Sequence, residues 1–147
     1  KFGLRGKMNN VQGAVLWYAK AAVDNVGNYG TLLRNKYWAV PALQPRMPFI
    51  DDKAPGKVKK LKVIEVAGDK VLFWTAPKGK DWRDNPHRYV VYRFEKGEKQ
   101  ELDNPRHIVA ITPDPFYKLP SADRATYVVT TLDRLQNESR GVKKKVK

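Results

Sequence analysis

The chain has 147 residues, of which 41% are hydrophobic, so it can hold one ordinary domain, or one small domain together with part of a larger one. It contains no cysteine, which excludes disulfide bonds, thiolate metal sites and a cysteine nucleophile. Its net charge of +14 favours polyanions in general as partners.

The chain opens with KFGLRGK, which has no initiator methionine and none of the segments of a signal peptide. We therefore expect a fragment whose targeting signal was removed or never included. No apolar run approaches the roughly 18 residues that a membrane span requires, so we expect no transmembrane segment in it.

The first part of the chain, residues 1–50, predicts one strand and one helix. The run VQGAVLWYA at 11–19 is typical of a buried strand, and DNVGN at 24–28 of a loop. The run YGTLLRNKYWAVPAL at 29–43 predicts an amphipathic helix that ends at Pro41. Its apolar positions at helical spacing are Leu32, Leu33, Tyr37 and Val40. One strand and one helix cannot close a core alone, so we expect the last β–α unit of a larger structure.

The segment MPFIDDKAPGKVKK combines prolines and a glycine with a change from apolar to charged sequence, which indicates a domain boundary. We place it at Asp51, giving domains 1–50 and 51–147. Five strand-like stretches follow without a helix: LKVIEV, KVLFWTAP, RYVVYRFEKGE, HIVAI and ATYVVTTLD. Their regular spacing predicts a mainly β fold, an antiparallel β-sandwich.

Alternation along the strands predicts which side chains face the core. The predicted inner positions of two strands are Leu72, Trp74, Tyr127, Val129 and Thr131. In RYVVYRF two faces are plausible, one with Tyr89 and Val91 and one with Val90, Tyr92 and Phe94. We favour the face with Tyr89 and Val91.

The stretch LP…ATYVVTTLDRLQNES resembles the end of a fibronectin type III domain, and the resemblance covers about residues 54–147. In that family a tyrosine hydroxyl ties a strand corner, and an aspartate precedes a Gly-Asn-Glu-Ser turn. The matching positions here are Leu119, Tyr127, Val129, Asp133 and Gln136–Ser139, with Gln136 in place of the usual glycine. VLFWTAP and YVVYR are similar to the second and third strands of the family, with Trp74 as its core tryptophan. The resemblance implies an immunoglobulin-like sandwich with structural roles for Trp74, Tyr89, Leu119 and Tyr127.

Residues 11–50 are similar to the last strand and helix of the barrel in bacterial proteins of the glycosyl hydrolase-like ten family. Members are typically envelope lipoproteins with a (β/α)₈-type catalytic barrel, and many continue into a fibronectin-like domain. This resemblance implies an upstream barrel domain as partner, a location in the bacterial cell envelope or secretion, and polysaccharide or peptidoglycan as the substrate of the whole protein.

Catalytic chemistry is not evident within the chain. A glycosidase needs two carboxyl groups on either side of the scissile bond, yet residues 1–50 hold only Asp24 and the other acidic residues fall in predicted linkers or turns. His87 and His107 lack the further ligands that a zinc site requires. We therefore expect no metal, no cofactor and no catalytic residue in this fragment, with the catalytic pair upstream.

Trp17, Tyr18 and Lys20 form a candidate substrate-binding set, because the C-terminal end of a barrel strand is where substrate sites are built. An aromatic ring there can stack on a sugar, and a lysine can bind hydroxyl or carboxylate groups. The alternative, that Trp17 and Tyr18 only pack within a buried strand, stays equally open.

Two lysine-rich runs, KVKKLK at 57–62 and KKKVK at 143–147, raise the question of nucleic-acid binding. Such a site would interleave aromatic and basic residues on one exposed face, whereas the aromatic residues here fall within strands. Lysines on edge strands also prevent edge-to-edge association. We favour a non-catalytic accessory module of a glycoside hydrolase. The alternative is a basic module that binds nucleic acid or an anionic polymer.

Overall fold

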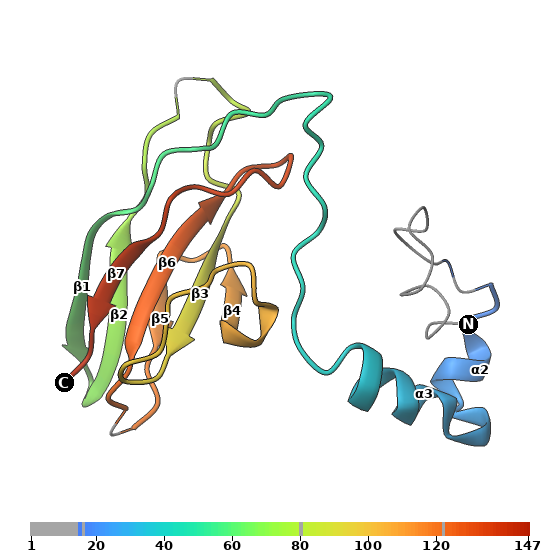
Figure 1. Cartoon of the computed structure of the whole chain (residues 1–147). Helices are drawn as coiled ribbons and strands as arrows, with labels where there is room; N and C mark the ends of the chain where they lie inside the picture. Colours follow the sequence, from blue (N-terminus) through green and yellow to red (C-terminus); the bar gives the residue numbers. More distant parts are fainter. Residues whose placement is uncertain (1–14, 16, 80, 122) are drawn as a thin grey trace. The chain divides into compact units, whose positions relative to one another are not determined.

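The computed structural model describes residues 15, 17–79, 81–121 and 123–147 (Figure 1). The chain divides into two compact units, Lys1–Val40 and Pro41–Lys147. The second unit thus begins ten residues before the boundary that the sequence suggested at Asp51. Among the described residues, no helix has both the length and the apolar character needed to cross a membrane.

The first unit contains short helical segments in place of one continuous helix. They are α2 (Lys20–Val23), the 3₁₀ turn η1 (Val26–Asn28), α3 (Tyr29–Leu32) and the π-helical turn η2 (Leu33–Tyr37). Left-handed backbone at Asn25, Gly27 and Asn28 interrupts them. The predicted helix begins at Tyr29 as expected, but only Leu33 of its apolar positions is buried.

The strand predicted over residues 11–19 is not formed in the part that the structure describes. Residues 15 and 17–19 have no strand conformation, and the side chains of Val15 and Trp17 are 94% and 96% exposed. A buried barrel strand takes its hydrogen bonds and its packing from neighbouring strands. No described residue before Lys59 forms a strand that could supply them.

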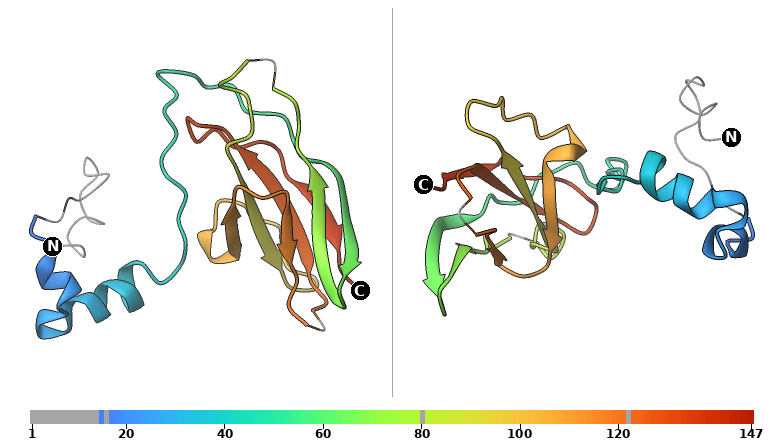
Figure 2. Two further views of the ribbon diagram at one scale, coloured as in Figure 1. Left: turned by 180° about the vertical axis from the view of Figure 1, so that it is seen from behind. Right: turned by 90° about the horizontal axis from the view of Figure 1, so that it is seen from below.

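The second unit is a mainly β structure of two antiparallel sheets. The strands are β1 (Lys59–Val66), β2 (Asp69–Thr75), β3 (Arg88–Phe94), β4 (Ile108–Thr112), β5 (Phe116–Lys118), β6 (Thr126–Leu132) and β7 (Val142–Lys145), with a 3₁₀ turn, η3, at Pro105–His107. One sheet has the order β1-β2-β5 and the other the order β4-β3-β6-β7. In the view from below in Figure 2, β1 and β2 lie on one side and β6 and β7 on the other. This arrangement agrees with the predicted β-sandwich.

The main core lies between the two sheets. It holds Leu72 and Trp74 of β2, which is the face predicted for that strand, together with Tyr89 and Val91 of β3. Tyr127 and Val129 of β6 complete the predicted inner face. The rings of Trp74 and Tyr89 meet edge to face with centroids 5.3 Å apart, a geometry that aromatic pairs prefer.

A second apolar cluster covers the opposite face of the four-stranded sheet. Its buried members are Val90, Tyr92, Phe94, Ile108, Val128 and Leu132. Leu43 and Leu102, from the segments before β1 and after β3, pack against it. Both faces of β3 and β6 are therefore buried, which explains why the sequence of β3 offered two plausible core faces.

The segment from Pro41 to β1 is attached to the sandwich. The Met47 amide donates to the Leu135 carbonyl at 3.2 Å, and the Asn137 side-chain amide donates to the Asp51 carbonyl at 3.0 Å. Val58 is buried in the main core. These contacts explain why the second compact unit includes residues that precede Asp51.

Candidate functional site

The predicted sugar-binding residues lie at the start of the described part of the first unit. Trp17 is almost fully exposed, and Tyr18 is 69% exposed with a left-handed backbone. The Lys20 ammonium forms an ion pair with Asp24, one helical turn later. Trp17 and Tyr18 are therefore accessible to a ligand, and their role in binding stays a prediction.

The four residues with predicted structural roles lie in the same core cluster. Trp74, Tyr89, Leu119 and Tyr127 all belong to the core between the sheets, and each is at most 4% exposed. Within the described residues, the indole nitrogen of Trp74 has no hydrogen-bond partner. The Tyr127 hydroxyl, by contrast, donates to the carboxylate of Asp123, four residues earlier.

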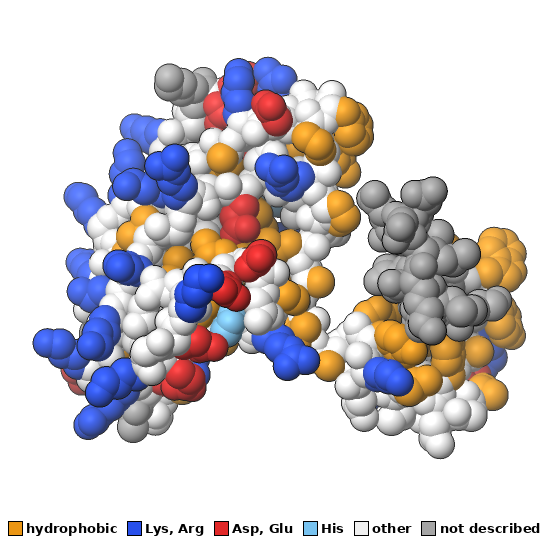
Figure 3. Space-filling view, viewed as in Figure 1, with side chains coloured by type: hydrophobic (Ala, Val, Ile, Leu, Met, Phe, Trp, Pro, Cys, Tyr) orange, Lys and Arg blue, Asp and Glu red, His pale blue; other side chains and the backbone are white. Residues whose placement is uncertain are grey.

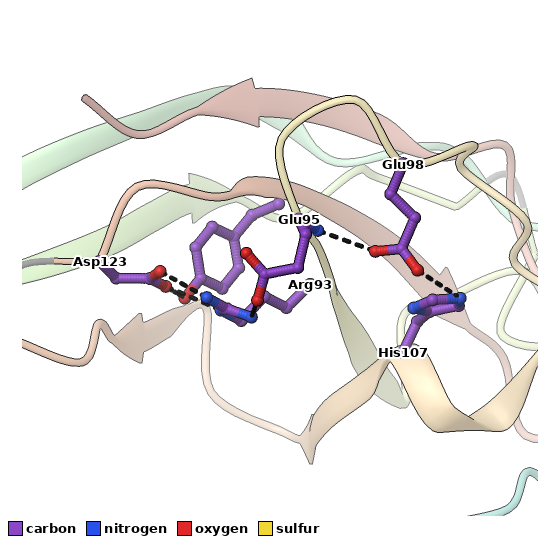
Figure 4. Close-up of polar contacts among 6 residues, drawn as sticks. Arg93, Glu95, Glu98, His107 and Asp123 are labelled. Carbon is purple, nitrogen blue, oxygen red and sulfur yellow. Dashed lines mark hydrogen bonds and ion pairs between the residues drawn. The ribbon is translucent and has the colours of Figure 1, made fainter.

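Arg93, near the end of β3, is the centre of a polar cluster at this corner. Its guanidinium donates two hydrogen bonds to Asp123, at 3.0 Å and 2.7 Å, and one to Glu95 at 2.6 Å. Figure 4 shows the guanidinium between the two carboxylates. Arg93 lies opposite Tyr127 in the β3–β6 register, so the strand pairing itself brings Arg93 to the segment that carries Asp123.

The cluster continues through Glu98 to His107. The Glu98 carboxylate accepts a hydrogen bond from the Glu95 amide at 2.8 Å and lies 3.7 Å from the His107 imidazole (Figure 4). The imidazole packs against the ring of Phe94, with centroids 4.5 Å apart. These contacts fix the loop that connects β3 to η3, and they place two acidic residues near the end of β3.

The charges of this cluster do not suit glycosidic bond cleavage. A general acid in such a reaction needs a carboxyl group whose pKa is raised. The two hydrogen bonds from Arg93 instead lower the pKa of Asp123 to about 2, and the hydrogen bond from Tyr127 acts in the same direction. Arg93 also bonds Glu95, so one guanidinium lies between the two carboxylates. The cluster therefore serves to hold a corner of the sandwich.

Other carboxylates outside this cluster form hydrogen bonds with residues close to them in the sequence. Asp81 bonds Arg83 two residues later, and Asp51 accepts from the Lys53 amide. Asp133, buried after β6, accepts from the amides of Leu135 and Asn137. Across the described ranges of the chain, no group of three or more His, Asp or Glu side chains could hold a metal ion.

A second buried polar contact lies on the outer face of the four-stranded sheet. Glu138 accepts hydrogen bonds from the hydroxyls of Tyr92 at 2.7 Å and Thr130 at 2.6 Å. Burial, followed by this hydrogen bond to Glu138, raises the pKa of Tyr92 far above its ordinary value. Glu138 also lines a hollow of about 300 Å³ together with Leu43 and Leu102. Two protein hydroxyls already occupy one oxygen of this carboxylate.

The lysine-rich runs lie at the open edges of the two sheets. β1 is the edge strand of one sheet, β7 is the edge strand of the other, and the two contact each other. In Figure 3 the blue side chains gather over the side of the sandwich where these strands lie. The exposed lysines of the two strands are Lys59, Lys60, Lys62, Lys143 and Lys145. This position agrees with a role in preventing edge-to-edge pairing.

Sequence reasoning missed Arg93, Glu95 and Asp123 as a connected group. One local signal was available: Asp123 lies four residues before the tyrosine that was expected to tie a corner. In immunoglobulin-like sandwiches the hydroxyl of such a corner tyrosine bonds to the backbone. The structure gives it a carboxylate, whose charge Arg93 balances.

The described part of the chain thus defines a mainly β protein of two facing antiparallel sheets, preceded by short helical turns. The chain is 29% identical, over 153 aligned residues, to the glycosyl hydrolase YngK of Bacillus subtilis (strain 168). The alignment covers 98% of this chain and 28% of that protein. No protein-family profile and no solved structure matches the chain. The similarity supports a glycosyl-hydrolase-like relationship over a minor part of the relative's length.

Proposed function

We propose that this chain is a non-catalytic accessory module of a glycoside-hydrolase-related protein. The similarity to a glycosyl hydrolase supports the class of the parent protein. The observation that carries the accessory role is the position of Arg93 between Asp123 and Glu95. One guanidinium binds both carboxylates and keeps Asp123 ionised, so Asp123 is unsuited to act as the general acid that a glycosidase needs.

The sandwich is proposed to be a fibronectin type III-like domain. In immunoglobulin-like sandwiches the third, sixth and seventh strands share a sheet, and the first, second and fifth share the other. The sheet orders β4-β3-β6-β7 and β1-β2-β5 agree with that pattern for these six strands, whereas β4 pairs with β3 instead of joining the sheet of β1, β2 and β5. Tyr127, the second residue of the sixth strand, bonds to a residue a few positions upstream, as a corner tyrosine does, although the acceptor is the Asp123 carboxylate and not the backbone. Leu119 and Trp74 lie in the core beside it.

The turn after β6 adds support for the same family. The Asp133 carboxylate accepts from the amide and the side chain of Asn137, and the Ser139 hydroxyl accepts from the Thr131 amide. Gln136, which stands where the family usually has glycine, has a φ of 66°. A left-handed residue at that position gives a physical reason for the family's glycine.

The first part of the chain, expected as domain 1–50 and ending at Val40 in the structure, is proposed to complete an upstream barrel domain of the same protein, which would be a partner of the sandwich. The side chain of Val15 is almost fully exposed, which supports a surface that such a barrel would cover. On the same basis the parent protein would act on polysaccharide or peptidoglycan in the bacterial cell envelope or outside the cell. Trp17, Tyr18 and Lys20 would then lie at its substrate site.

A second candidate function is a basic module that binds an anionic polymer. The lysines on the edges of β1 and β7 support it, since they concentrate positive charge on one side of the sandwich (Figure 3). Nucleic acid is the less favoured ligand, because the aromatic side chains of the strands lie mostly in the two cores.

The accessory role is tested by assaying the chain for release of reducing ends from peptidoglycan and from a panel of polysaccharides. We expect no release above that of a heat-denatured sample. Hydrolysis that the unmodified chain performs and that Glu95→Gln and Asp123→Asn abolish, in samples with native circular dichroism, would refute the proposal. Glu65→Gln, on the exposed side of β1, is the matched control.

A further inference from the structure

A pocket of about 430 Å³ opens at one end of the sandwich. Three segments form it: the turn after β3 with Lys96 and Gly97, the start of β6 with Arg124, and the end of β7. Lys145 and Lys147 line it from the β7 side. The pocket therefore combines side chains that are distant in the sequence, within a size range typical of small-ligand sites.

The floor of the pocket is well fixed. The Val146 amide donates to the Ala125 carbonyl at 2.9 Å, and both residues are almost fully buried. Thr126 and Lys145 are directly paired between β6 and β7. Because the backbone here is already ordered, binding a ligand would require ordering only of the side chains that contact it.

The side chains around this floor carry a positive charge that is not balanced locally. The lining contains four cationic side chains, Lys96, Arg124, Lys145 and Lys147, and no acidic side chain, and in the 147-residue chain the α-carboxylate of Lys147 offsets one of the four charges. Within the described residues, none of these four forms an ion pair with a carboxylate. Like charges held together repel one another, so an anion entering the pocket would relieve that repulsion.

The acidic residues next to the pocket in sequence are already engaged. Asp123 precedes Arg124 and Glu95 precedes Lys96, yet both carboxylates bind Arg93. The Asp123 side chain is only 5% exposed. Both carboxylates that adjoin lining residues in the sequence are therefore engaged by Arg93 and do not form ion pairs with the cations of the pocket (Figure 4).

The lining also indicates which kind of anion fits. It contains no aromatic residue, so bases of a single-stranded nucleic acid would find nothing on which to stack. Exposed guanidinium and ammonium groups bind carboxylates and phosphates by charge-assisted hydrogen bonds. The chain's relationship to a glycosyl hydrolase makes a glycan the polymer to which such groups would be attached.

We propose that the pocket formed by Lys96, Arg124, Lys145 and Lys147 binds the carboxylate or phosphate groups of an anionic glycan. This inference rests on the proposed accessory function and assigns it a ligand class and a site. The sandwich would hold the parent protein on an acidic polymer by this pocket, and neutral glycans would not be retained.

The test is isothermal titration calorimetry, which measures the affinity of the 147-residue chain for each of four probes. Oligogalacturonate carries carboxylates, phosphomannan carries phosphates, dextran is neutral and oligothymidylate represents nucleic acid. The pocket variant is Arg124→Gln/Lys145→Gln. The matched control, Arg134→Gln/Arg140→Gln, removes the same charge from exposed positions beside the other ends of β6 and β7.

We expect the unmodified chain to bind at least one acidic glycan and not dextran, and the more tightly bound one identifies the anionic group. The pocket variant should lose about tenfold or more in affinity, and the control less than about twofold. Arg124→Lys/Lys145→Arg, which keeps the charge, should retain most of the binding.

Three results would overturn the proposal: no binding of either acidic glycan, equal losses in the pocket and control variants, or tighter binding of oligothymidylate than of both glycans. These outcomes are separate from the accessory role. Hydrolysis by the chain would refute the accessory role without affecting the pocket, whereas an inactive chain that binds no acidic glycan would refute the pocket alone.

Discussion

The hydroxyl of Tyr127 donates to the carboxylate of Asp123, and both side chains are nearly inaccessible to solvent. Burial, followed by this hydrogen bond, raises the pKa of Tyr127 well above its ordinary value. Arg93 neutralises the same carboxylate, so the three residues act as one unit. The unit ties the start of β6 to the end of β3 and leaves the neighbouring cations of the pocket without acidic partners.

Removing the hydroxyl should weaken the sandwich without changing its shape. Tyr127→Phe keeps the ring in the core and removes one hydrogen bond to a charged group, so we expect the free energy of unfolding to fall by about 1.5–3 kcal/mol. Urea denaturation measures the change. Tyr18→Phe, at an exposed position, should stay within about 0.5 kcal/mol of the unmodified chain. Equal effects of the two substitutions would contradict the role given to the corner.

The free energy of unfolding should depend on pH through the ionisation of Asp123. Its pKa is lowered from 3.8 to about 2, so it contributes stability above about pH 4 that is lost as the pH falls through 2. We expect the difference in unfolding free energy between the unmodified chain and Asp123→Asn to shrink over this range. The change should be at most about 2 kcal/mol, because Arg93 is partly exposed and solvent screens the pair. A difference that is constant from pH 6 to pH 2 would argue against the ion pair.

Two tryptophans provide a matched test of the core. Trp74 is fully buried between the sheets, so Trp74→Ala should lower the unfolding free energy by about 3–5 kcal/mol. Trp17 is almost fully exposed, and Trp17→Ala should leave stability unchanged. Chemical denaturation followed by circular dichroism measures both. A large loss from Trp17→Ala would show that residues 1–40 contribute to the stability of the sandwich.

The turn after β6 offers a stabilising substitution. Gln136 has a φ of 66°, a conformation that costs a residue with a Cβ about 1–2 kcal/mol and glycine much less. Gln136→Gly should therefore raise the unfolding free energy, by up to about 1 kcal/mol after the entropy of glycine in the unfolded chain is counted. Gln100→Gly, at a loop position that does not itself have a positive φ, should be neutral or destabilising. A loss of stability at position 136 would contradict this account of the turn.

The sequence predicted the sandwich because its signals are local. Alternating apolar residues identify the strands, and Leu72, Trp74, Tyr89 and Val91 lie on the predicted inner face. The contact between Arg93 and Asp123 spans 30 residues and depends on the β3–β6 register, which no local pattern specifies. The second core, which buries Tyr92 and Phe94, depends on loops that fold back over the sheet.

The first unit was harder to predict for a different reason. The apolar run that includes Val15 and Trp17 has the composition of a buried strand, but a strand forms only where a neighbour supplies hydrogen bonds. The helix predicted from Tyr29 forms only as short turns, and Leu33 alone among its apolar positions is buried. The composition thus indicates that these side chains are suited to burial. The described residues, however, provide no surface against which most of them pack.

Hydrogen–deuterium exchange of backbone amides tests the central claim most directly, which is that an independently stable sandwich follows residue 40. We predict the slowest exchange in β3 and β6, which are paired on both sides, and exchange that is orders of magnitude faster in α2 and α3. Equal protection of α3 and β6, or rapid exchange throughout β3, would contradict the account.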